Sequence, residues 1–306
     1  MGSVPFNAAE ALAAALRGTR RAAFVGLAKN VGKTTALVAA AEALSRSELV
    51  AGATSAGRDG EEFDAITGER KPRFRLWPGQ LVASAAACFA ASEIDSEIVE
   101  RLPFHTRFGT IEVRRVRRAG AVEVVGPSTA QELAGTSTGL ERAGARIVLL
   151  DGAFGRRAFA GARVAGGVVL SIGAAVGGNV ERVVARALAA ADLVRLPAAA
   201  SGAQQRHVVG ALTDAALDEI APAEGVTLIV DDFASVFLSA GALERLRTDG
   251  VVLAVRHPSR LLAVTTNPTA PGAEGFRAEE LFEATVKAFP GVLVLDLVAE
   301  LVAGGK

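Results

Sequence analysis

Several residue types are scarce in this chain of 306 residues, and each scarcity excludes a class of protein. There is one cysteine, Cys88, so a disulfide framework within the chain is impossible. The three histidines, His105, His207 and His257, are widely separated and have no Cys or His neighbour at ligand spacing, which argues against a zinc site. Tyrosine is absent, which reflects compositional bias rather than a function.

An excess of charge of either sign is also missing. Lys plus Arg and Asp plus Glu number 33 each. A net charge of zero gives no general attraction to nucleic acid or to an anionic membrane surface. The basic run Arg114, Arg115, Arg117 and Arg118 has no interleaved aromatic residues, so a solvated hairpin edge is favoured over a nucleic-acid patch.

No apolar run is long enough to suggest a membrane anchor. The most apolar window, Val164 to Gly177, is too short and too rich in glycine to span a bilayer. The first residues, Met1 to Gly18, are interrupted by Glu10 and have no basic start, so we expect no secretory signal. These features predict a cytoplasmic protein that binds neither nucleic acid nor a membrane.

Short apolar runs alternate with helical stretches along most of the chain. This pattern is typical of an α/β fold with a mostly parallel sheet and helices on both faces. Residues 71–127 differ, because they contain several prolines and segments that suggest antiparallel strands. We predict a small β-rich insertion there, with Thr110–Val116 and Ala121–Val125 forming a hairpin around Gly120. Loop lengths are ordinary and no repeat is visible, which favours a single domain over residues 1–306.

The segment Gly26 to Thr35, with the sequence GLAKNVGKTT, lies between a predicted strand and a predicted helix. That context is the one a phosphate-binding P-loop needs, because backbone N–H groups entering a helix form an anion cradle. We predict that the cradle is formed by Lys29, Asn30, Val31, Gly32, Lys33, Thr34 and Thr35. In it, Lys33 would reach the β- and γ-phosphates and the Thr34 hydroxyl would ligate Mg²⁺.

The loop departs from the usual P-loop spacing. Leu27 stands where a glycine is usual, and Gly26 lies one residue too early. The alternative interpretation is an ordinary glycine-containing turn between strand and helix. Lys29 invites comparison with the extra lysine of P-loop ATPases that dimerise over nucleotide, but it lies one place closer to Gly32 than that lysine does. A solvated loop lysine is therefore favoured over activation across a homodimer.

A magnesium ion bound to a triphosphate needs a carboxylate near the end of a neighbouring strand. Two aspartates follow apolar strands in this way, Asp151 and Asp231. We favour Asp151, because Gly152 permits close approach, although either residue could instead cap a turn. A polar loop after the second predicted strand adds Asp59, Glu61 and Asp64 as candidates. Of these, Asp59 is the predicted catalytic and metal-linked residue.

Asn267 ends a late predicted strand, where it could hydrogen-bond a purine edge. No Asn/Thr-Lys-x-Asp motif stands there, so adenine is preferred to guanine and ATP is the expected nucleotide. The alternative is a simple Asn-Pro turn formed with Pro268.

Five segments together resemble the ATPase subunit of the lysine 5,6-aminomutase reactivase family. They are Gly26 to Thr35, Thr54 to Pro72, Val122 to Ser128, Asp151 to Phe159 and Thr265 to Pro271. The resemblance implies a partner-stimulated P-loop ATPase that reactivates an adenosylcobalamin-dependent aminomutase by driving exchange of damaged cobalamin.

The resemblance also implies roles for individual residues. Lys33 and Thr34 would bind phosphate and Mg²⁺, and Asp59 and Asp151 would flank the γ-phosphate. The partner would be an aminomutase or a second reactivase subunit, and cobalamin would be involved only through that partner. Phe154 and Gly155 depart from the family pattern, in which we expect Leu and Asp or a similar pair.

Two other functions compete with this interpretation. One is a small-molecule kinase or ligase of the dethiobiotin-synthetase type, suggested by the phosphate loop together with Lys71-Pro72. The other is a nucleotide-sensing protein that does not turn over its nucleotide.

Overall fold

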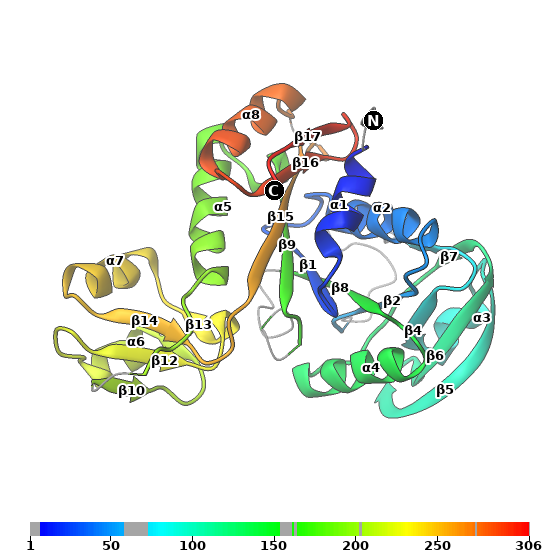
Figure 1. Ribbon diagram of the computed structural model, residues 1–306, viewed down its shortest axis with the longest axis horizontal. Coiled ribbons are helices and arrows are strands. Elements are labelled where there is room, and N and C mark those ends of the chain that lie inside the picture. The colour runs from blue at the N-terminus through cyan, green and yellow to red at the C-terminus, as the bar shows by residue number, and fades with distance from the viewer. Residues whose placement is uncertain are drawn as a thin grey trace.

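The structure is a computed structural model that describes residues 7–57, 73–153, 161, 164–201, 204–272 and 274–305. It is an α/β protein built on a large, mostly parallel sheet (Figure 1). No helix in these ranges is long and apolar enough to cross a membrane. The eight α-helices of the described residues are α1 (Ala8–Leu16), α2 (Lys33–Ser45), α3 (Ala86–Ala90), α4 (Ala130–Arg142), α5 (Val180–Val194), α6 (Asp214–Ile220), α7 (Ala240–Thr248) and α8 (Ala278–Ala288).

Ten of the described strands form the central sheet. In spatial order they are β17 (Leu301–Ala303), β16 (Leu293–Asp296), β15 (Arg260–Asn267), β9 (Gly167–Gly173), β1 (Arg21–Gly26), β8 (Ile147–Ala153), β2 (Ala51–Ser55), β4 (Leu81–Ala85), β6 (Gly109–Arg118) and β5 (Asp95–Thr106). The strands from β16 to β4 are parallel, whereas β17, β6 and β5 add antiparallel edges. The central strands are buried on both faces, which is why they are almost continuously apolar in sequence.

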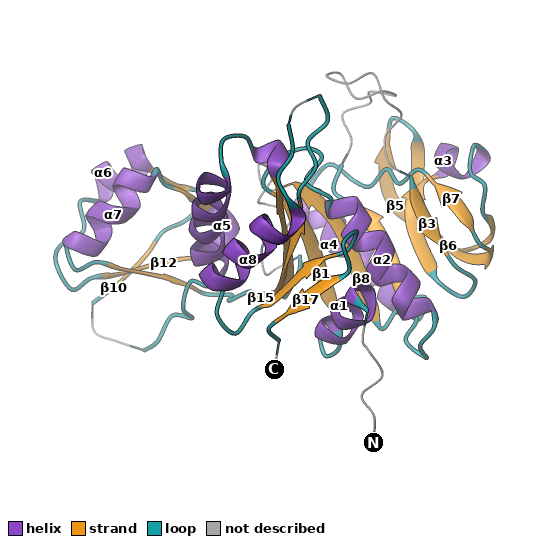
Figure 2. Ribbon diagram, turned by 90° about the horizontal axis from the view of Figure 1, so that it is seen from above, coloured by secondary structure: helices purple, strands orange, loops and turns teal. Residues whose placement is uncertain are grey.

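Alternation along the central strands assigns each face to a different set of helices. In β1, Ala22 and Phe24 belong to a buried cluster with α1 and α2, whereas Ala23 and Val25 belong to a cluster with α4. Helices α5 and α8 pack with β9, β15 and β16 in a third cluster. The sheet is therefore covered on both faces, with α1 and α2 on one side (Figure 2).

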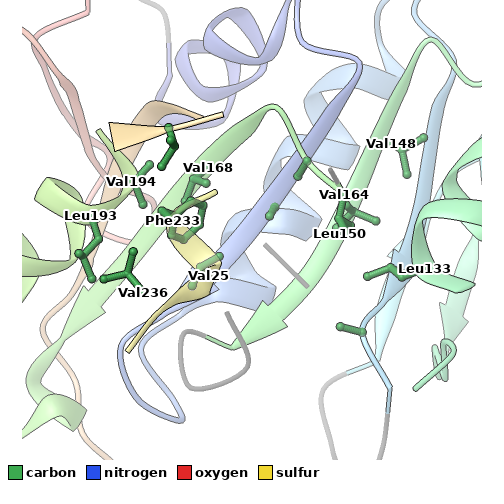
Figure 3. Close-up of a cluster of buried hydrophobic side chains, with 14 of the residues drawn as sticks. Val25, Leu133, Val148, Leu150, Val164, Val168, Leu193, Val194, Phe233 and Val236 are labelled. Carbon is green, nitrogen blue, oxygen red and sulfur yellow. The ribbon is translucent and has the colours of Figure 1, made fainter. Parts of the chain in front are cut away.

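Residues 204–259, called the small lobe below, form a second parallel sheet. Its strands are β10 (Gln205–His207), β12 (Thr227–Val230) and β14 (Val252–Val255). The short strands β11 (Leu212–Thr213) and β13 (Val236–Phe237) pair with each other beside it. A buried cluster continues from Val25 and Val168 of the central sheet into Phe233 and Val236 of the small lobe (Figure 3).

The small lobe contains two successive units of the same form. Each has a strand, a short strand and a helix: β10, β11 and α6, then β12, β13 and α7. Thr213 caps α6 and Ser239 caps α7, each by accepting a hydrogen bond from a backbone N–H three residues later. The two units share an order of elements and not a run of identical residues.

Within residues 73–127 the structure is rich in β-strands, but the predicted hairpin is wrong. Strand β6 pairs with β4 and β5, and the tight turn lies between Thr106 and Gly109. The segment β7 (Gly120–Val122) pairs instead with β3 (Phe74–Leu76). Gly120 makes no turn; a Cβ there would come within 2.7 Å of the Glu93 backbone. Alternation identified these strands, but it carries no information about which strand is the partner.

Candidate functional site

The loop between β1 and α2 lies at the carboxyl ends of the central parallel strands. Strand β1 is flanked by β8 on one side and by β9 on the other (Figure 1). The chain first places β2 and β8 on one side of β1 and then crosses to β9 and β15 on the other. Ligands of open α/β sheets bind at this kind of topological switch point, so the fold and the motif indicate the same location.

The backbone of this loop is shaped by residues with positive φ. Asn30 has a φ of 62° and Gly32 a φ of 84°, the latter at the N-cap of α2. Glycine adopts this left-handed conformation without the steric cost that a Cβ imposes. The first N–H groups of α2 follow directly after Gly32 and have no partner within the helix, so they are available to a bound group.

Gly26 has a packing role that explains the unusual spacing of the motif. A Cβ at Gly26 would come within 2.6 Å of Val31 Cγ2, and Val31 is buried. The next residue, Leu27, donates its N–H to the Ser171 carbonyl oxygen at 3.2 Å and so continues the contact with β9. Because Gly26 has no Cβ, Val31 can pack against the end of β1. The position of Leu27 does not require a glycine in this arrangement.

Lys33 and Asp151 form an ion pair at the centre of the site. Lys33 Nζ lies 2.6 Å from Asp151 Oδ1, and their side chains are 26% and 14% exposed. Asp151 is opposite Phe24 in the register of β1 and β8. Because Asp151 lies two residues after Leu149, which packs in the α2 cluster, strand alternation directs its side chain toward α2.

The groups around this ion pair suit a magnesium ion. Asp151 Oδ1 is buried and has no hydrogen-bond partner of good geometry, although Lys33 Nζ lies within ion-pair distance. Thr34 Oγ1 lies 3.5 Å from Lys33 Nζ. A carboxylate and a hydroxyl are hard oxygen donors of the kind that Mg²⁺ prefers. Among the described residues, no group of three or more His, Cys, Asp or Glu side chains gathers as a metal cluster.

Asp231, the competing aspartate, lies in the other sheet. It follows β12 of the small lobe and pairs with Arg256, whose Nη1 donates to Asp231 Oδ1 at 2.9 Å. Arg256 Nη2 also lies 3.4 Å from His207 Nδ1. The loop between β1 and α2 thus has Asp151 as its neighbouring acid, and Asp231 belongs to a surface cluster of the small lobe.

Asn267 contacts the loop between β1 and α2, and its side chain braces that loop by a hydrogen bond. Its Nδ2 donates to the Asn30 carbonyl oxygen at 2.9 Å, and its Oδ1 accepts from Thr269 N at 3.1 Å and Thr269 Oγ1 at 2.8 Å. Its Cβ would be 3.3 Å from a Cβ added at Gly32. The amide is therefore engaged at both ends, by the Asn30 carbonyl and by Thr269.

The other predicted residues are placed as follows. Lys29 is exposed on the loop, Thr35 is exposed in the first turn of α2, and Val31 is buried. The predicted acidic residues Asp59, Glu61 and Asp64 lie outside the described residues, as do Lys71, Phe154 and Gly155.

The sequence analysis did not identify a set of small polar residues in β9 and β15, near the loop between β1 and α2. Thr265 Oγ1 donates to Ser171 Oγ at 2.8 Å, and both residues are buried. Next to them, Thr266 Oγ1 donates to Asp296 Oδ2 at 3.0 Å. A Cβ at Gly173 would come within 2.2 Å of the Asn267 carbonyl oxygen. The sequence did contain a signal for this set, because Ser171, Thr265 and Thr266 are hydroxyl residues within otherwise apolar strands.

Comparison of the chain with family models, with curated proteins and with solved structures found no match.

Proposed function

We propose that this protein is a P-loop nucleoside triphosphatase that binds Mg-ATP at the loop between β1 and α2. The observation that carries the proposal is the 2.6 Å contact between Lys33 Nζ and Asp151 Oδ1 beside a glycine-shaped helix N-terminus. A lysine, a hydroxyl and a carboxylate from two adjacent strand ends form the donor set that phosphoryl transfer requires. An ordinary turn between strand and helix has no need of a nearly buried carboxylate aimed at its lysine.

Each residue then has a defined task. The N–H groups from Asn30 to Thr35 and the N-terminus of α2 would hold the phosphates. Lys33 would exchange its contact with Asp151 for the β- and γ-phosphate oxygens. Thr34 and Asp151 would hold Mg²⁺, which neutralises charge on the transferred phosphoryl group when bound. Asn267 would keep the Asn30 carbonyl turned away from the phosphates by holding it in a hydrogen bond.

We further propose that hydrolysis acts on a partner protein, as in the aminomutase reactivase family that the sequence resembles. One contact supports such coupling. A Cβ at Gly161, on the connection that follows Asp151, would lie 2.3 Å from Asp232 Oδ2 of the small lobe. Asp232 is buried and caps the turn at Phe233, which is anchored in the core. Gly161 therefore lies against the small lobe, ten positions after Asp151 in the sequence.

The decisive experiment measures Mg-ATP and Mg-GTP binding and hydrolysis for the wild type and for Lys33→Ala. Lys287→Ala is the matched control, because Lys287 is an exposed lysine on α8. We expect Lys33→Ala to lose binding and Lys287→Ala to retain it. Unchanged affinity of Lys33→Ala for Mg-nucleotide would refute the phosphate site.

The partner is tested separately by adding an adenosylcobalamin-dependent aminomutase inactivated by damaged cofactor. We expect slow hydrolysis alone, stimulation by the mutase, and recovery of mutase activity only with ATP. Robust hydrolysis that ignores the mutase and requires a small carboxylic acid would overturn the reactivase proposal in favour of a kinase or ligase. Nucleotide binding without turnover under any condition would leave a sensing protein.

A further inference from the structure

A cavity of about 430 Å³ lies at the amino-terminal ends of the central strands. Residues Gly18 to Arg21 line it where the chain enters β1, and Arg260 lines it at the start of β15. Because these strands are parallel, the cavity lies at the opposite edge of the sheet from the phosphate loop. It is therefore separate from the proposed nucleotide site.

The cavity has more positive than negative charge. Arg21 Nε and Nη2 donate to the two carboxylate oxygens of Glu141 at 2.8 and 2.9 Å. These hydrogen bonds lower the pKa of Glu141, so the pair is ionised but neutral overall. Arg20 approaches Glu141 only at 4.0 Å and is 82% exposed. Arg260 makes no ion pair with any residue that the structure describes. Two guanidinium charges are therefore left over.

The remaining lining is polar and leaves backbone accessible. Val164 is the one apolar side chain among the described lining residues. A Cβ at Gly18 or Gly166 would meet no atom within 4 Å, so the space beside both residues is open. A hydrophobic ligand would find little apolar surface here, whereas a small polar anion would find guanidinium forks and backbone groups.

We propose that this cavity binds a small multivalent anion carrying phosphate or paired carboxylate groups, held by Arg20 and Arg260. The planar guanidinium fork matches both oxyanions and binds them with two parallel hydrogen bonds. Arg21 is held in place by Glu141 and Thr138, so its guanidinium group lines the cavity but its charge is already paired. The volume is within the range of sites for small ligands. This inference does not depend on the proposed ATPase activity.

Isothermal titration calorimetry on the Lys33→Ala protein tests the proposal, because that background removes anion binding at the phosphate loop. Inorganic phosphate and pyrophosphate form one arm, and succinate and citrate form the other. We expect one bound anion per chain, in one arm or both, with affinity that falls as salt is added. The arm that binds identifies the chemical source of the anion.

Variants locate the binding. Arg260→Gln and Arg20→Gln should each weaken binding about tenfold or more, which is the scale of a lost charged hydrogen bond. Arg17→Gln is the matched control: Arg17 is exposed and caps α1 one residue outside the cavity lining, and this change should leave affinity unaltered. Arg20 is so exposed that its variant should fold even if Arg260→Gln does not.

Two results would overturn the proposal. One is the absence of binding heat with all four anions. The other is equal weakening by Arg17→Gln and Arg20→Gln, which would indicate general charge attraction and no defined cavity site. Neither result tests nucleotide binding at Lys33, so failure of this inference is distinguishable from failure of the proposed function.

Discussion

The central sheet and the sheet of the small lobe both contain a strand that runs from apolar residues into an aspartate. Asp151 lies within β8 near its carboxyl end, and Asp231 directly follows β12. Asp151 forms an ion pair with Lys33 at the start of α2, whereas Asp231 pairs with Arg256 and is 38% exposed. An acid at a strand end thus becomes a candidate metal ligand only when the adjacent strand supplies an anion-binding loop.

The junction between the two sheets gives the largest expected effect. Phe233 is 2% exposed and packs in the cluster that joins the small lobe to the central sheet (Figure 3), whereas Phe237 is 45% exposed on β13 of the same lobe. Phe233→Ala should lower the free energy of unfolding by about 3–5 kcal/mol. Phe237→Ala should lower it by about 1 kcal/mol or less. Urea unfolding followed by circular dichroism measures both, and equal costs would show that the cluster does not anchor the lobe.

The two aspartates themselves can be compared by matched substitutions. Asp151→Asn should reduce ATP hydrolysis on the order of a hundredfold, because it removes the carboxylate that would hold the metal. Asp231→Asn makes the same chemical change in the small lobe and should leave hydrolysis within about twofold, since Asp231 contacts Arg256 rather than the loop. A steady-state phosphate-release assay at saturating Mg-ATP measures both. A larger loss in the Asp231 variant would reverse the comparison.

The brace at Asn267 predicts a smaller effect. Asn267→Ala removes the hydrogen bond to the Asn30 carbonyl and should cost about 1 kcal/mol, or about fivefold in nucleotide affinity. ATP and GTP should weaken by the same factor, because the brace shapes the phosphate loop and does not read the base. Equilibrium titration with both nucleotides checks this. A change in the ratio of ATP to GTP affinity would instead indicate that Asn267 contacts the purine base.

The smallest effect is expected from the Arg21–Glu141 pair at the amino-terminal edge of the central sheet. Arg21 lowers the pKa of Glu141, so the pair stabilises the folded protein above the ordinary pKa of a glutamate. This stabilisation is lost as the pH falls through the lowered pKa of the folded state. Glu141→Gln should therefore have a lower Tm than the wild type at neutral pH, and the difference should shrink in acid. A difference that grows as the pH falls would contradict the sign of the shift.

Local sequence patterns predicted a large part of the fold and of the candidate site. The α/β class followed from the alternation of apolar runs and helical stretches. The order of strand, loop and helix around Gly32 was predicted and is present as β1, loop and α2. The packing of Gly26 against Val31 was not predicted, because that contact depends on how the loop folds over the strand.

The same patterns could not predict which strands pair with each other. The run from Gly109 to Arg118 pairs with β4 and β5, and the predicted partner near Gly120 pairs elsewhere. Likewise, the strands of the small lobe have the same apolar character as those of the central sheet, and nothing local assigns them to a sheet of their own. Pairing is a contact between distant segments, so short-range periodicity cannot decide it.

By itself, the sequence determined which segments would be strands or helices in the central α/β core and that a glycine-containing loop would join a strand to a helix at Lys33. Those properties follow from side-chain periodicity, glycine conformation and helix N–H groups, all of which act within a few residues. Only the tertiary structure decided that Asp151 rather than Asp231 meets Lys33 and that Asn267 braces the loop. These depend on strand order and on contacts between residues more than a hundred positions apart, which the packing of the whole chain creates.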